Sequence, residues 1–272
     1  MTTATLTRAA SQPAGRYGFR AVAQMEWLKL RSVRSTWWSL LVLAAGLIGL
    51  AILVMAHQHW ATMSAADRAS FDPANDSFAG LAIGQLAVGV LGVLAVTSEF
   101  SSGMIRATFA AAPRRPLVLA AKAAVLTAVT LVTGEILAFA AFWAGEAVLR
   151  APAPHAALAQ PGVLRAVLMA GAYPALIALI GLGLGALIRH TAGAISAVVG
   201  VLFVLPLILH PLGTSIQNAA GQFMPMLIAE NSLTAVKPVP HSLSPGLGLG
   251  LLSLYAVAAL AAGGWALTRR DA

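Results

Sequence analysis

Six long apolar runs, separated by short polar segments, constrain the fold of this chain more than any other feature. The runs extend over Trp37–Ala56, Phe78–Val96, Leu117–Trp143, Val163–Ile188, Thr191–Leu209 and Leu247–Leu267. A helix needs roughly 20 mostly apolar residues to cross a bilayer. Only 10% of the 272 residues are charged, whereas a soluble domain carries about 25%. The sequence therefore predicts an all-α, polytopic membrane protein with six transmembrane helices.

The spacing of the runs also predicts the domain organisation. We expect a cytoplasmic tail and interfacial helix over residues 1–36, a six-helix transmembrane domain over 37–267 and a cytoplasmic C-terminal tail over 268–272. The fourth and fifth runs are separated only by Arg189 and His190. A tight turn there gives six spans, and a single kinked helix would give five. The first 20 residues hold no apolar run long enough for a signal-peptide core, so we expect the first run to be retained.

The distribution of basic residues predicts the orientation. With six spans, thirteen of the 17 lysine and arginine residues lie on one side: Arg8, Arg16, Arg20, Lys29, Arg31, Arg34, Arg106, Arg114, Arg115, Lys122, Arg189, Arg269 and Arg270. Because basic loops stay in the cytoplasm, we expect a multi-pass protein of the cell (plasma) membrane with both termini cytoplasmic. The net charge of +8 sits at the ends of apolar runs, which indicates contact with the lipid bilayer and no nucleic-acid partner.

The segment before the first run has the pattern of an amphipathic helix. At 100° per residue, one face holds Arg20, Gln24, Trp27, Arg31 and Arg34, and the opposite face holds Phe19, Val22, Met25, Leu30 and Val33. Such a helix is suited to the inner membrane interface, with its arginines toward anionic lipid. Glu26 and Lys29 intrude on the apolar face and are spaced so that they can pair. The helix serves as a membrane-surface anchor or also contacts a cytoplasmic partner.

Two connecting segments carry further information. The loop Thr97–Pro116 predicts a short helix with apolar residues Met104, Ile105 and Phe109, stopped by prolines. This loop is either a docking element or an ordinary interfacial turn. The long segment His210–Gly246 contains FMPMLIAENSL, which is too short to span. We expect re-entrant helices in this fifth outer loop, or else a simple folded loop.

Polar residues inside the runs are few. Glu135 lies mid-span, where a charge is costly, so it is expected to face protein or water. A hydrogen bond between helices and a role on a substrate pathway both fit Glu135. Gln85 is a candidate for the same two roles, and helix packing is the more usual one. Gly181, Gly183 and Gly185, like Gly80 and Gly84, indicate close helix contacts. We expect no catalytic residues and no metal site, because catalytic motifs are absent and His57 and His59 are too few ligands.

Two stretches together resemble a known family. EWLKLRSVRSTWW, which leads into the first span, and SEFSSGMIRATFAAAPRRPLVLAAK, which follows the second, resemble the membrane subunits of type-2 ATP-binding cassette (ABC) exporters, and most closely permeases of actinobacterial type. The resemblance covers essentially the whole chain. It implies that the N-terminal helix and the loop after the second span dock onto a separate ATPase. The implied docking residues are Glu26, Lys29, Arg31, Glu99, Phe100, Gly103, Met104 and Arg106.

The resemblance further implies that two permease subunits, alike or different, form the pathway between them. The chain has no G-x-x-x-x-G-K-[ST] motif, so we expect no cofactor in this chain and ATP with Mg²⁺ in a partner P-loop ATPase. The sequence thus predicts a non-enzymatic permease subunit of an ATP-driven exporter. An intramembrane enzyme or an accessory membrane scaffold is the alternative, and an ion-coupled transporter would need more buried charge. The low charge favours an amphipathic or apolar substrate.

Overall fold

The structure is a computed structural model that describes residues 18–209, 211, 213, 219–235 and 242–269. In these residues it contains helices and no strand. The elements are α1 (Phe19–Ser32), α2 (Arg34–Ala56), α3 (Ala65–Ser70), α4 (Pro73–Asp76), α5 (Leu81–Ser101), α6 (Met104–Ala111), α7 (Arg115–Val148), α8 (Val163–Ile188), α9 (Thr191–Val199), α10 (Leu205–Leu209), α12 (Pro225–Leu233) and α13 (Pro245–Arg269), with short segments at Trp60–Thr62 and Gly200–Val204.

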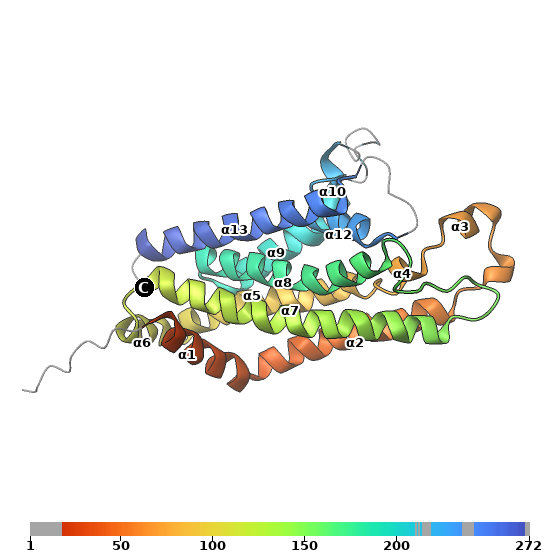
Figure 1. Cartoon of the computed structure of the whole chain (residues 1–272). Coiled ribbons are helices and arrows are strands. Elements are labelled where there is room, and N and C mark those ends of the chain that lie inside the picture. Colours follow the sequence, from red (N-terminus) through yellow and green to blue (C-terminus); the bar gives the residue numbers. More distant parts are fainter. Residues whose placement is uncertain (1–17, 210, 212, 214–218, 236–241, 270–272) are drawn as a thin grey trace, which may run out of the picture.

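Six helices are long and apolar enough to cross a membrane: α2, α5, α7, α8, the continuous stretch Thr191–Leu209 and α13. They run side by side in alternating directions (Figure 1). This confirms the predicted all-α, multi-pass membrane protein. The helical bundle has two ends, which carry different short helices. We call the end with α1, α6 and the C-terminal turns of α13 the proximal end, and the end with α3, α4 and α12 the distal end.

Helix α8 lies at the centre of the bundle and packs against α5, α7 and α13. Its glycines make these contacts close, as the sequence predicts. A Cβ atom on Gly181 would lie 2.3 Å from the carbonyl oxygen of Gly89, and one on Gly183 would lie 2.4 Å from the carbonyl carbon of Ala259. Because both obstacles are backbone atoms, they cannot move away by a change of rotamer. Helix α8 therefore approaches its neighbours this closely only because glycine has no side chain.

The fourth and fifth spans are separated by a tight turn, as predicted, and do not form one kinked helix. Helix α8 ends at Ile188 and α9 begins at Thr191. Arg189 has a φ of 60°, and its guanidinium donates a hydrogen bond to the carbonyl of Ala266 at 2.8 Å. Arg115 donates to the carbonyl of Leu267 at 2.7 Å. Two arginines from other elements thus bind the C-terminal carbonyls of α13, where positive charge is favoured.

The short helices lie at the two ends. At the proximal end, α1 packs mainly against α7. At the distal end, α12 has nine residues and packs against α8 and α13 without crossing the bundle. Pro225 occupies the first turn of α12, where its missing N–H is not needed. Residues 210, 212, 214–218 and 236–241, which also belong to the predicted re-entrant segment, lie outside the described residues.

Candidate functional site

A cluster of buried charges joins four elements at the proximal end. Lys122 of α7 donates to Oε2 of Glu26 on α1 and, at 2.7 Å, to Oε1 of Glu99 on α5. We call Glu26, Lys29, Glu99, Thr108 and Lys122 the proximal charge cluster. Lys122 thus connects the short helix α1 to two of the long helices.

Lys29 and Thr108 complete the proximal charge cluster. Lys29 Nζ donates to Glu26 Oε1 at 2.9 Å, to Glu99 Oε1 at 3.0 Å and to Thr108 Oγ1 at 3.2 Å. Thr108, on α6, in turn donates to Oε2 of Glu99 at 3.2 Å. The predicted pairing of Glu26 with Lys29 is therefore present. Glu99 accepts hydrogen bonds from three side chains, one each on α1, α6 and α7.

The proximal charge cluster is buried except for the partly exposed Lys29, and it is electrically balanced. Glu26 and Glu99 are each 2% exposed and Lys122 is 4% exposed. Two lysines oppose two glutamates, so the formal charge is zero. Burial alone would lower the pKa of Lys29, but the hydrogen bonds and negative charges of Glu26 and Glu99 outweigh burial and raise it. Lys29 consequently carries its charge at neutral pH. Removing one partner from such a group costs about 3–5 kcal/mol, because an unpaired charge stays buried.

Local structure explains how the chain assembles this cluster. We predicted that the second span ends at Val96, but α5 continues to Ser101, which places Glu99 in its last turn. Gly103 then has a φ of 71°, a backbone conformation that glycine adopts without a side-chain clash. This sharp reversal begins α6. One turn later, Thr108 is buried in contact with Lys29 and Glu99.

The predicted docking residues therefore occupy two different environments. Glu26, Lys29 and Glu99 face one another inside the protein, and Phe100 is half-buried with the Arg189 guanidinium 5.1 Å from its ring centroid. The exposed members of the set are Arg31, Gly103, Met104 and Arg106. Docking by this set stays a prediction. The exposed members provide a surface for contact, and the buried members connect that surface to the long helices.

The two pathway candidates are also in different settings. Gln85 is 1% exposed and accepts a hydrogen bond from the phenol of Tyr173 on α8, in keeping with helix packing. Glu135 of α7 packs against α8, where a Cβ atom on Gly171 would lie 2.4 Å from its Cδ. Its Oε2 atom is buried and has no hydrogen-bond partner among the described residues.

Sequence reasoning missed two members of the proximal charge cluster. Lys122 was interpreted only as a basic residue near the end of a span, and Thr108 received no role. Lys122 lies seven residues after the first residue of α7, which is about 10 Å at 1.5 Å per residue. A lysine that far into an apolar helix needs a negative partner. That need was readable in the sequence, but the identity of the partners was not.

Neither the family models nor the curated proteins that were searched give a match to the chain. Its function must therefore be argued from its own residues.

Proposed function

We propose that the chain is the membrane-spanning permease subunit of an ATP-driven ABC exporter, works as a dimer of permease subunits and is coupled to a separate P-loop ATPase. It lies in the plasma membrane with both termini in the cytoplasm, so the proximal end is the cytoplasmic end. The observation that carries the proposal is the proximal charge cluster, because it fastens two short helices at that end to the long helices α5 and α7.

The coupling mechanism follows from this connection. An ATPase that moves α1 or α6 would act on Glu99 and Lys122 through short, charge-assisted hydrogen bonds, which are stronger than neutral ones. The displacement would pass to the ends of α5 and α7 and change the pathway between two permease subunits. ATP and Mg²⁺ would belong to the ATPase, and this chain would supply no catalytic residue.

Two finer features support the same arrangement. Phe19, Trp27 and Leu28 on α1 are about half exposed or more, which suits a helix lying in the lipid interface. At the other end, α12 buries Ile228, Ala229 and Leu233 against the bundle. A short helix held in this way suits a re-entrant element at the outer surface, because protein surrounds it.

The proposal is tested by purifying the tagged chain from its native host in mild detergent and identifying co-purifying proteins by mass spectrometry. We expect a stoichiometric P-loop ATPase. Combined replacement of the exposed pair, Met104→Glu and Arg106→Glu, is expected to reduce ATPase recovery at least tenfold. Arg150→Glu is the matched control, because Arg150 is exposed at the distal end. An absent ATPase, or equal recovery with both variants, would contradict the proposal and favour an intramembrane enzyme or scaffold.

A further inference from the structure

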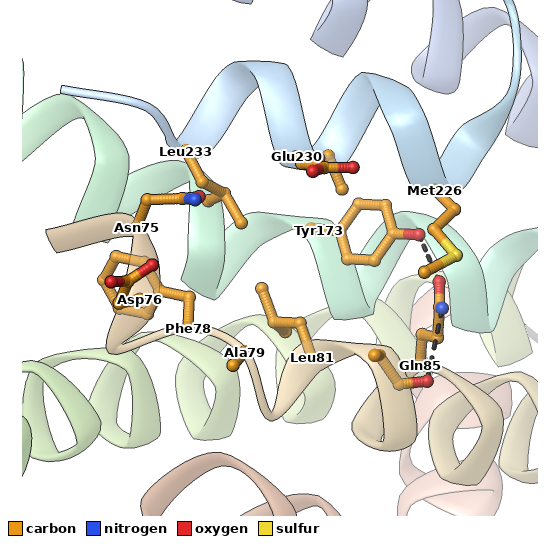
Figure 2. A pocket seen from close by; sticks show the side chains of 12 residues that line it. Asn75, Asp76, Phe78, Ala79, Leu81, Gln85, Tyr173, Met226, Glu230 and Leu233 are labelled. Carbon is orange, nitrogen blue, oxygen red and sulfur yellow. Dashed lines mark hydrogen bonds between the residues drawn. The ribbon is translucent and has the colours of Figure 1, made fainter. Parts of the chain in front are cut away.

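A second site lies at the distal end, away from the proximal charge cluster. A cavity of about 270 Å³ opens between α4, the start of α5, α8 and α12. We call it the distal cavity. Figure 2 shows its lining, with Asp76 on the α4 side and Glu230 on α12. Cavities that hold drug-sized ligands are about 300–1,000 Å³, so the distal cavity suits a smaller molecule.

The lining of the distal cavity is mostly apolar, with two carboxylates and three uncharged polar residues, Asn75, Gln85 and Tyr173. Phe78, Leu81, Met226 and Leu233 supply apolar surface. Among the described residues that line the cavity there is no lysine, arginine or histidine. An apolar cavity with negative groups and no positive one selects for a cation that carries an apolar body.

The two carboxylates lack positive partners in the described part of the chain. The one hydrogen bond that the Asp76 carboxylate accepts there is a long contact of 3.5 Å from the Gln58 amide. The Glu230 carboxylate has no hydrogen bond to a described residue and is exposed. Burial and the nearby charge of Asp72 raise the pKa of Asp76 to about 6. An anion in this setting is stabilised by any cation that enters the cavity.

The inner part of the distal cavity is held by a buried polar pair. Tyr173 and Gln85 are 3% and 1% exposed and bond to each other through the phenol and the side-chain amide oxygen, as Figure 2 shows. This bond joins α5 to α8 and fixes the aromatic ring beside the cavity. Aromatic rings attract organic cations, the more so when water is excluded.

We propose that the distal cavity binds a small organic cation, an amine or quaternary ammonium with an apolar body. The positive nitrogen lies against Asp76 and Glu230, and the apolar part lies against Phe78, Leu81 and Met226. A lipid headgroup such as choline and a free amine share this chemistry. The inference does not depend on an ATPase, since the chain alone forms the site.

The test measures binding of benzyltrimethylammonium to the full chain in detergent by equilibrium dialysis. Its neutral isostere, neopentylbenzene, has carbon in place of nitrogen and is the matched ligand control. We expect the cation to bind at least about tenfold more tightly, which corresponds to about 1.4 kcal/mol. Because this comparison uses the unaltered chain, it does not depend on any variant folding. Equal binding of the two ligands would overturn the proposal.

Three variants localise the site. Asp76→Asn is expected to weaken cation binding about tenfold and Glu230→Gln about threefold, because an exposed charge is screened by water. Asp67→Asn should bind like the unaltered chain, because Asp67 is exposed on α3 and does not line the cavity. Unchanged binding in both cavity variants would overturn the assignment. So would displacement of the organic cation by millimolar Ca²⁺, which would indicate a metal site instead.

A last comparison distinguishes the two sources of the cation. The binding assay is repeated in nanodiscs made of phosphatidylcholine or of phosphatidylglycerol. If the natural ligand is a choline headgroup, phosphatidylcholine should compete and reduce benzyltrimethylammonium binding at least threefold. Equal binding in both lipids identifies a free amine as the ligand. Loss of binding in both lipids, with binding retained in detergent, would overturn the proposal for the membrane-embedded protein.

Discussion

At the proximal end, Glu26 and Glu99 are both bonded to lysines, whereas at the distal end Asp76 and Glu230 line a cavity with no cationic partner among the described residues. Charged residues that satisfy one another hold elements together and leave nothing for a ligand. Carboxylates beside a cavity leave an interaction unmade that a ligand can supply. The pairing of the carboxylates, more than their number, therefore separates a structural joint from a binding site.

The largest expected effect comes from breaking the proximal charge cluster. Lys122→Met would leave Glu26 and Glu99 buried with only the partly exposed Lys29 opposing them. We expect a loss of about 3–5 kcal/mol in the free energy of unfolding, since an uncompensated buried charge stays in the protein. Thermal unfolding in detergent, followed by tryptophan fluorescence, measures the change.

A matched control and a rescue make this prediction specific. Arg106→Met removes an exposed charge on α6 and should change stability little. Adding Glu99→Gln to Lys122→Met removes one negative charge along with the positive one, so the cluster regains neutrality and part of the lost stability should return. If Lys122→Met is no worse than Arg106→Met, the cluster is not a joint and the comparison between the two ends fails.

The comparison also assumes that a closely packed bundle separates the two ends, and the second prediction tests that packing. Gly181→Ala would place a Cβ atom 2.3 Å from the carbonyl oxygen of Gly89, so α8 and α5 would have to separate. Overpacking of this kind costs about 1–3 kcal/mol. Thermal unfolding again measures the loss.

Glycines elsewhere in the spans provide the control for Gly181→Ala. A Cβ atom on Gly49 of α2 or on Gly250 of α13 would meet no atom within 4 Å. Alanine at these positions should leave stability unchanged or slightly raised, because alanine favours the helix. Equal losses at all three glycines would show that close packing against α8 is not what the glycines provide.

The third prediction concerns Asp76, whose carboxylate has no cationic partner among the described residues at the distal end. In contrast to the first two substitutions, replacing this residue is expected to raise the stability. The pKa of Asp76 in the folded protein is about 6, above its ordinary value of 3.8. Folding therefore favours the protonated carboxyl, and the stability contributed by Asp76 is present at low pH and lost as the pH rises through about 6. Asp76→Asn removes this loss. At pH 7.5 we expect a higher melting temperature, on the scale of about 2–4 °C per kcal/mol.

The pH dependence checks the cause of that gain. At pH 5 the carboxyl of Asp76 is largely protonated in the folded state, so the advantage of Asp76→Asn should shrink. The other titratable groups at this place are Asp72, Glu230 and Tyr173, and Glu230→Gln serves to separate their contribution. A variant that gains stability at pH 7.5 yet loses cation binding would show that the carboxylate is retained for a ligand and not for the fold. A pH-independent difference would show that Asp76 carries no such penalty.

Sequence reasoning predicted the spans well because bilayer thickness fixes the length of an apolar run. All six predicted spans begin within three residues of the start of the observed helix. The ends were less predictable. Helix α5 continues through the polar residues Ser98 and Glu99, since Lys29 and Lys122 compensate the charge of Glu99.

The candidate sites were harder to predict than the spans, because their members are far apart in the sequence. Glu26 and Lys122 are separated by 96 positions, and no local pattern connects them. The distal cavity combines Asp76 with Glu230 through the packing of α12, which the short apolar segment alone did not indicate. Charges that meet only through tertiary packing cannot be paired from a single sequence.

The smallest effect is expected at Glu135, whose carboxyl group lies between the two ends. Its Oε2 atom has no hydrogen-bond partner among the described residues and is packed against Gly171. Glu135→Gln keeps the shape and breaks no described hydrogen bond, so we expect the free energy of unfolding to change by less than about 0.5 kcal/mol. Gly171→Ala, which forces a Cβ atom against the same carboxyl, should cost more. A large loss of stability in Glu135→Gln would reveal a structural hydrogen bond between helices. Unchanged stability with altered transport would assign Glu135 to the substrate pathway, and a carboxyl group between the two ends would then have a function of its own.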